Sequence, residues 1–274
     1  MRSGLRRAAA LCMTVLLLCL CACGGWGENT SGTSEPVTSP DAAQIRYNDL
    51  RLPYSRADSL DPFRAKSTVN RQLTTLLYDS LFILDGSFEA KPLIAREYTT
   101  DNYSGLGTRN DGVRFSDGSV LTVQDVLYSF RLAKDSDRFK ARLRNVDAAS
   151  ERGADAVLFT LVSVDPYAVA CLDFPIVKSG TSFEDRKALR AQTTDQDDTA
   201  PAKTTDQELP VGSGRYVLSY EENESDPILT AFNDRFKGFY PAMSVIRLVN
   251  ATDSSALFYS LEIGNISYAF DDLS

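Results

Sequence analysis

The sequence predicts a globular protein with a mixed α/β fold. The alternation of segment types along the chain indicates the fold class, and the composition indicates a globular protein. Helix-like stretches with apolar residues on one face alternate along the chain with short runs rich in Val, Ile, Leu, Tyr and Phe. The composition, 43% hydrophobic and 24% charged, is ordinary for a globular protein. No internal repeat is visible.

The first 22 residues have the pattern of a signal peptide. Three arginines near the start precede an apolar stretch over residues 8–22, and the small residue Ala22 stands before Cys23. This stretch is short for a membrane-spanning helix. We therefore expect cleavage before Cys23 and lipidation of that cysteine. An uncleaved N-terminal anchor is the alternative, and Cys19 or Cys21 is the alternative site of modification.

Residues 23–43 are expected to form a lipid-anchored, flexible tether. They are rich in Gly, Ser, Thr, Glu, Asn and Pro and show almost no apolar periodicity. The folded body is then predicted over residues 44–274. Once the signal peptide is removed and Cys23 is lipidated, Cys171 is the one remaining thiol, so the body must be stabilised by its core and not by disulfides.

Three helices are predicted in the body. The first covers residues 70–82, with Ser67 or Thr68 as its N-cap. The second begins after Thr122, where Asp125 completes a capping-box pattern. The third begins at Asp253 or Ser254 and ends near residue 264, where a glycine provides a C-terminal cap.

Five strands are predicted from β-branched and aromatic runs bounded by turn residues, at residues 156–161, 215–220, 228–232, 245–249 and 266–270. Residues 98–111 are rich in Gly and Asn and are expected not to form a strand. The polar stretch 195–208 is expected to be a solvated loop and not a calcium site, because it lacks the glycine and final glutamate of an EF-hand loop.

The composition argues for binding and against most catalysis. The chain has 0 His, which excludes Ser-His-Asp and Cys-His nucleophile systems and removes the commonest zinc ligand. The net charge of −8 becomes about −11 without the signal arginines, so nucleic acid is a poor partner. We expect no cofactor, no metal and no catalytic residue.

Several motifs, in a fixed order, carry a family resemblance. They are Leu60-Asp61-Pro62, residues 77–82, residues 91–95, residues 112–118 running into 121–130, residues 210–216 and residues 232–241. In this order and spacing the chain resembles the extracellular solute-binding proteins of peptide- and nickel-type ABC importers (family 5). The segment 112–130 is the most specific of these matches.

The resemblance implies a periplasmic-binding-protein-like fold of the peptide-binder class. Such proteins have two lobes that close on a ligand held in the cleft between them. They work outside the cytoplasm, at the Gram-positive surface or in the periplasm, and deliver the ligand to a membrane permease. Family members continue well beyond the region matched here, so we expect residues 44–274 to form lobe one, with the second lobe missing and the chain truncated.

The resemblance also suggests ligand-binding residues. Residues 64–68 correspond to the segment that runs beside an extended peptide, pairing through main-chain groups, and there we select Lys66, Ser67 and Thr68. Phe139 is expected to form an aromatic wall. Phe270 and Asp271 lie at the crossover between lobes. Each has a structural alternative: loop and helix cap for 66–68, ordinary packing for Phe139, and hinge scaffold for 270–271.

The expected ligand is a peptide or another small solute, and the expected partners are an ABC permease and the membrane. Two other classes remain open. One is a stand-alone interaction lobe with no transport role, and the other is an extracellular enzyme that uses a pair of carboxylates. No acidic pair falls in a motif that fixes the separation such an enzyme needs.

Overall fold

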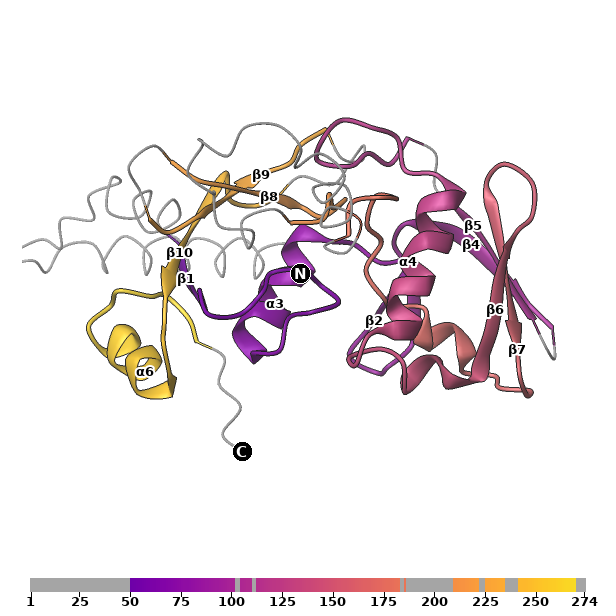
Figure 1. Ribbon diagram of the computed structural model, residues 1–274, viewed down its shortest axis with the longest axis horizontal. Helices are drawn as coiled ribbons and strands as arrows, with labels where there is room; N and C mark the ends of the chain where they lie inside the picture. The colour runs from indigo at the N-terminus through magenta and orange to yellow at the C-terminus, as the bar shows by residue number, and fades with distance from the viewer. Residues whose placement is uncertain are drawn as a thin grey trace, which may run out of the picture. The chain divides into compact units, whose positions relative to one another are not determined.

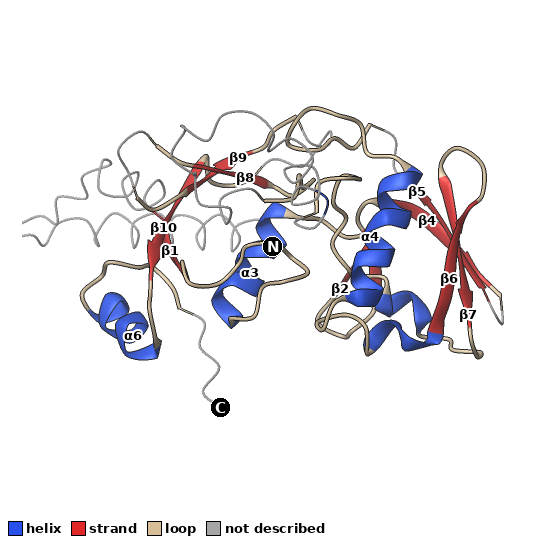
Figure 2. Cartoon of the chain, in the orientation of Figure 1, coloured by secondary structure: helices blue, strands red, loops and turns tan. Residues whose placement is uncertain are grey.

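Two four-stranded sheets, each with a helix against it, organise the part of the chain that the computed structural model describes (Figures 1 and 2). The described residues are 50–101, 104–109, 112–182, 185, 209–221, 225–234 and 241–269. They belong to one compact unit, residues 41–274. Cys23, Phe270, Asp271 and the polar stretch 195–208 lie outside the described residues.

The first sheet combines the two ends of the described chain. Its strand order is β1-β10-β9-β8, with bounds Leu50–Tyr54, Val245–Asn250, Ile228–Ala231 and Tyr216–Ser219. β1 runs parallel to β10, and the other pairs are antiparallel. The strands predicted at 215–220, 228–232 and 245–249 are therefore confirmed, each to within one residue at either end.

The second sheet is antiparallel, with the order β4-β5-β7-β6 and the bounds Ala95–Thr100, Ser104–Arg109, Ala156–Leu161 and Val146–Glu151. The strand predicted at 156–161 is confirmed residue for residue. The expectation that residues 98–111 form no strand is wrong. β5 lies between β4 and β7 and pairs with both, so the two neighbours hold a Gly-containing segment that has weak β-propensity of its own.

The three predicted helices are present, and their caps explain where they begin. The first, predicted over residues 70–82, ends already at Leu77, and Phe82 begins a strand instead. α3 (Thr68–Leu77) is capped by Ser67, whose hydroxyl accepts the Asn70 N–H. α4 (Val123–Asp135) is capped at Thr122, whose N–H and Oγ1 both donate to Asp125 at 2.7 Å. In α6 (Ser254–Glu262) the cap is a carboxylate.

That carboxylate belongs to Asp253, which accepts the Ala256 N–H, and Gly264 follows the helix with a φ of 73°. Both match the predicted start and end of α6. The strand predicted next, at residues 266–270, is not formed over 266–269. Ser267 makes one backbone hydrogen bond to the Arg51 carbonyl at the free edge of β1. Among the described residues, no helix has both the length and the apolar character needed to cross a membrane.

Smaller elements lie between the helices and the strands of the two sheets. β2 (Phe82–Leu84) and β3 (Ala90–Pro92) form a hairpin, and 3₁₀ turns lie at Arg142–Asn145 and Ala168–Cys171. The second turn contains the described free thiol, Cys171.

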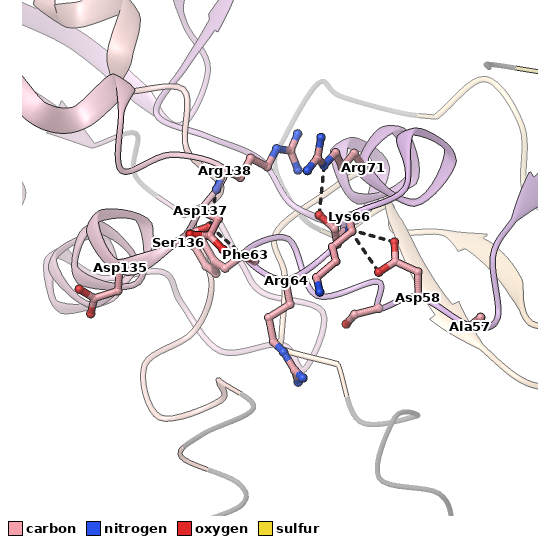
Figure 3. A pocket seen from close by; sticks show the side chains of 12 residues that line it. Ala57, Asp58, Phe63, Arg64, Lys66, Arg71, Asp135, Ser136, Asp137 and Arg138 are labelled. Carbon is pink, nitrogen blue, oxygen red and sulfur yellow. Dashed lines mark hydrogen bonds between the residues drawn. The ribbon is translucent and has the colours of Figure 1, made fainter. Parts of the chain in front are cut away.

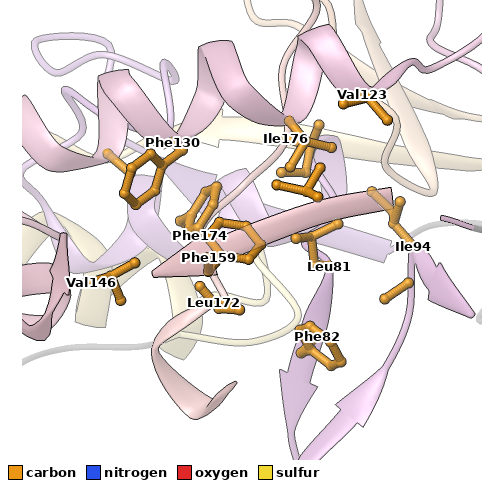
Figure 4. Close-up of a cluster of buried hydrophobic side chains, with 14 of the residues drawn as sticks. Leu81, Phe82, Ile94, Val123, Phe130, Val146, Phe159, Leu172, Phe174 and Ile176 are labelled. Carbon is orange, nitrogen blue, oxygen red and sulfur yellow. The ribbon is translucent and has the colours of Figure 1, made fainter. Parts of the chain in front are cut away.

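Each sheet has its own apolar core. The larger core, shown in part in Figure 4, lies around α4, the second sheet and the hairpin, and includes Phe82, Phe115, Phe159 and Phe174. The other core gathers α3 and the first sheet, with Leu73, Leu77 and Leu229 among its members. Phe63 packs against both cores. The loop that contains Phe63 therefore lies at the junction of the two.

Two glycines allow α3 to meet the first sheet closely. A Cβ built on Gly214 would lie 2.2 Å from the Leu77 carbonyl carbon, and one on Gly212 would lie 2.2 Å from the Leu77 oxygen. The Gly214 N–H donates to the same oxygen at 2.9 Å. These positions need glycine because of close backbone approach, and not because of an unusual φ.

Candidate functional site

The loop between β1 and α3 is fixed by one carboxylate. Asp58 accepts hydrogen bonds from the Lys66 N–H at 2.9 Å, the Ser67 N–H at 2.7 Å and the Ser67 hydroxyl at 2.8 Å. Burial alone would raise the pKa of Asp58, but these bonds hold it below its ordinary value of 3.8. At neutral pH the loop therefore closes around an ionised carboxylate.

A buried amide fixes the same loop from the other side. Asn70 is fully buried on α3, and its Nδ2 donates to the carbonyls of Ser55, Asp58 and Ser59 at 2.9–3.1 Å. Its Oδ1 accepts the Ser55 N–H at 2.8 Å. Because this side chain is completely used in holding backbone groups, the loop has a defined shape before any ligand arrives.

A cavity of about 480 Å³ lies between this loop and the turn after α4 (Figure 3). We call it the junction pocket. It is lined by Ala57, Asp58, Ser59, Phe63, Arg64, Ala65, Lys66, Arg71, Asp135, Ser136, Asp137 and Arg138. The Ser136 hydroxyl donates to the Phe63 carbonyl at 2.8 Å, so the two walls are tied directly.

More basic than acidic side chains line the junction pocket, and two of the acidic ones are already hydrogen-bonded within the protein. Four basic side chains line it, Arg64, Lys66, Arg71 and Arg138, against three acidic ones. Asp58 is used by the loop, and Asp137 is bonded to Lys140, which lowers the pKa of Asp137. The pocket is therefore positive in a protein whose net charge is negative.

The structure separates the predicted site residues. Lys66 lines the junction pocket, whereas Ser67 and Thr68 line a different cavity of about 170 Å³ beside the start of α6. The Lys66 and Ser67 N–H groups, which main-chain pairing with a peptide would use, are bonded to Asp58. The binding roles of the three residues stay predictions.

Phe139 is only 3% exposed. Its ring packs edge-on against Phe63 at 6.0 Å, and the Arg138 guanidinium lies over it at 4.9 Å. Its surroundings are those of a core residue, and its role as an aromatic wall stays a prediction. Phe270, Asp271 and the lipidation site Cys23 lie outside the described residues.

Sequence reasoning missed Asp58, Arg71 and Arg138. A signal was present for Arg71, since Arg64, Lys66 and Arg71 form a basic cluster within eight residues of an acidic chain. Arg138 had no such signal, because only the tertiary fold brings the turn after α4 to this loop. In the described part of the chain, no three Asp, Glu or Cys side chains gather in a way that could hold a metal ion.

Comparison with known proteins gives one family. A model described as bacterial extracellular solute-binding proteins, family 5 Middle, matches residues 110–272. Protein XP55 of Streptomyces lividans is 28% identical over 223 residues, which make up 78% of this chain and 37% of XP55.

Solved structures give the same fold. The oligopeptide-binding protein AppA from Bacillus subtilis, in complex with a nonapeptide, matches with a TM-score of 0.59 at 19% identity, over 80% of this chain and 43% of AppA. NikA from Staphylococcus aureus, in complex with Ni(L-His)2, matches with a TM-score of 0.57 at 18% identity, over 80% of this chain and 42% of NikA. The chain thus spans about two fifths of the length of these relatives.

Proposed function

Because the chain belongs to the bacterial extracellular solute-binding proteins of family 5, we propose that it captures peptides or similar small solutes and delivers them to an ABC permease. The family match covers more than half of the chain, and the fold agrees with it. Peptide is the preferred solute because AppA, which shares this fold, is an oligopeptide-binding protein.

The observation that supports this proposal most directly is the preformed junction pocket. Its volume of about 480 Å³ falls within the range of roughly 300–1,000 Å³ that is usual for small-molecule sites. Asp58 and Asn70 already hold one wall in place. A wall that is ordered before binding lowers the entropic cost of capture.

The test is a thermal melt of the purified chain with and without a mixed peptide library. A ligand that binds only the folded state, at 100 times its dissociation constant, stabilises that state by about 2.7 kcal/mol, which should raise the melting temperature by several degrees. Ala57→Trp, which places a bulky side chain at an exposed position in the pocket, should abolish the rise.

Ala154→Trp, at an exposed position on the turn between β6 and β7, is the matched control and should keep the full rise. A cooperative melt that no peptide moves would contradict peptide capture. Self-association without ligand would then favour a stand-alone interaction lobe. If nickel with L-histidine raises the melting temperature and no peptide does, the solute is a nickel complex and not a peptide.

We also propose that Cys23 anchors the protein to the membrane by a lipid. The support is the arginine-led apolar stretch that ends at Ala22. With Cys23→Ser, the protein should move from the membrane fraction to the soluble fraction, whereas Cys171→Ser should remain with the membrane. Retention of Cys23→Ser on the membrane would favour an uncleaved N-terminal anchor instead.

A further inference from the structure

The last described helix exposes apolar side chains over most of its surface. α6 follows β10 (Figure 1), and Leu257 is the only buried one of its nine residues. Five apolar side chains in and just after this helix are between 40% and 62% exposed, and we call them the α6 surface: Phe258, Tyr259, Leu261, Ile263 and Tyr268. A helix that is apolar on most sides normally has a partner, so the α6 surface marks a contact site.

An apolar cavity adjoins the α6 surface. It has a volume of about 270 Å³ and is lined by residues of β1 and α3 together with Tyr268. These residues are Leu52, Pro53, Val69, Gln72, Leu73, Thr75, Leu76 and Tyr268. Because Tyr268 belongs to both, the cavity and the α6 surface are continuous. None of the described residues that line the cavity is charged, so a hydrocarbon group can enter it without burying a charge.

The α6 surface itself also contains little charge. Glu262 is the one charged residue of α6, in a chain of which 24% is charged. Three of the five exposed side chains are aromatic, and two of these, Tyr259 and Tyr268, end in a hydroxyl group. Rings that bury an apolar body and keep a polar end in water are typical of the interface between a membrane and water.

β1, the strand that the predicted tether enters, lies beside this region. The Arg51 N–H donates to the Ser267 hydroxyl at 3.1 Å, and the Ser267 N–H donates to the Arg51 carbonyl at 2.8 Å. Cys23 precedes Leu50 by 27 positions. A flexible chain of that length spans roughly 30 Å. A lipid on Cys23 therefore keeps the α6 surface within reach of the membrane.

The area of the α6 surface fits a tethered contact better than a stable dimer. Five side chains that are each about half exposed present on the order of 400–500 Å². A specific protein–protein interface buries about 800 Å² on each partner. A tether makes the second contact intramolecular, so that a small area is sufficient.

We propose that the α6 surface and its adjoining cavity rest on the lipid surface to which Cys23 anchors the protein. The inference rests on the lipid anchor proposed above and goes beyond it, because it assigns the face of the protein that meets the bilayer. A single small apolar contact gives only marginal membrane binding. The contact therefore orients the anchored protein and does not replace the anchor, in agreement with the release expected for Cys23→Ser.

Fluorescence quenching by brominated lipid tests this contact. The membrane-bound protein is purified from a bacterial host and reconstituted into phosphatidylcholine vesicles with ordinary or with brominated acyl chains. Trp26→Phe removes the one tryptophan of the chain, and Tyr259→Trp then reports on the α6 surface. Its fluorescence should be about twofold or more lower with brominated chains. Tyr167→Trp, an exposed position just before the 3₁₀ turn at Ala168–Cys171, is the matched control and should change little.

A charge placed in the α6 surface should abolish the effect. Phe258→Glu changes a half-exposed side chain, so it should reduce the quenching of Tyr259→Trp to the control level without lowering the melting temperature. Val162→Glu, at an exposed position away from α6, should leave the quenching intact. If Tyr259→Trp protein that stays on the vesicles is not quenched, the proposal is overturned. Dimerisation of Cys23→Ser protein that Phe258→Glu abolishes would, in that case, assign the surface to a second copy.

Sedimentation of the vesicles separates failure of the anchor from failure of the contact. If the protein does not sediment with them, the Cys23 anchor is contradicted, and the quenching is measured again with vesicles in large excess. Quenching of Tyr259→Trp that grows with lipid and is lost in Phe258→Glu would support the membrane contact without the anchor. If excess lipid causes no quenching, the membrane contact fails as well.

Discussion

Asp58 controls the shape of the site although it was not among the residues predicted to form it. It bonds two consecutive backbone N–H groups and the hydroxyl that caps α3. The N-cap role of Ser67 could be predicted from sequence because capping depends on residues only three positions apart. The role of Asp58 could not be predicted in this way. It depends on how the loop folds back to bring residues 66 and 67 beside residue 58.

Replacement of this carboxylate should destabilise the protein in a pH-dependent way. Asp58→Asn should lower the free energy of unfolding by about 1–3 kcal/mol at pH 7, because the bonds it weakens involve a charged acceptor. The pKa of Asp58 is lowered in the folded state, so its contribution is complete above the ordinary value of 3.8 and is lost as the pH falls below it.

Urea unfolding at pH 7 and at pH 3 measures this effect. The loss caused by Asp58→Asn should be smaller at pH 3 than at pH 7. Asp147→Asn, an exposed carboxylate on β6, should change the unfolding free energy by less than about 0.5 kcal/mol at either pH. An equal loss for Asp58→Asn at both pH values would contradict the assigned role of its charge.

Among the elements, those with strong local signals were predicted best. Two examples are the capping box at Thr122 and Asp125 and the apolar run at 156–161. In each case the pattern that predicts the element lies within a few neighbouring residues. β5 was missed because pairing with strands on both sides, and not its own composition, holds it in place. The strand predicted at 266–270 is not formed over its described residues, 266–269. Ser267 contributes one backbone hydrogen bond to the edge of β1, and the full pairing that would define a strand is not formed there.

No side chain should be tolerated at Gly214, where the residues that precede β8 meet the end of α3. Gly214→Ala would place a Cβ 2.2 Å from the backbone at Leu77, and neither segment can move without breaking the bond between Gly214 and Leu77. We expect a loss of more than about 3 kcal/mol or failure to fold.

Gly86→Ala provides the comparison, since a Cβ there meets nothing within 4 Å and the residue has no positive φ. Thermal melts of the two variants should differ by many degrees, with Gly86→Ala close to the unsubstituted protein. A Gly214→Ala protein with an unchanged melting temperature would show that the two segments can separate at little cost.

For the whole molecule, the sequence could indicate the family but not the chemistry of the candidate site. The resemblance directed attention to residues 64–68, and Lys66 does line the junction pocket. The partner wall, with Arg138, comes from a turn about 70 residues further on, and no local pattern links the two. The charge of the pocket is thus a property of the assembled fold.

The pairing of β1 with β10 has a consequence for the order in which the chain can become native. Leu50 lies opposite Ile246, and Tyr54 opposite Asn250, so the first described strand pairs with the last one. During synthesis β4 to β7 can assemble early, because their partners are close in sequence, whereas β1 gains its neighbour only after residue 250 has been made. Until then β1 has no partner strand on either side, which leaves this segment of the nascent protein open to aggregation.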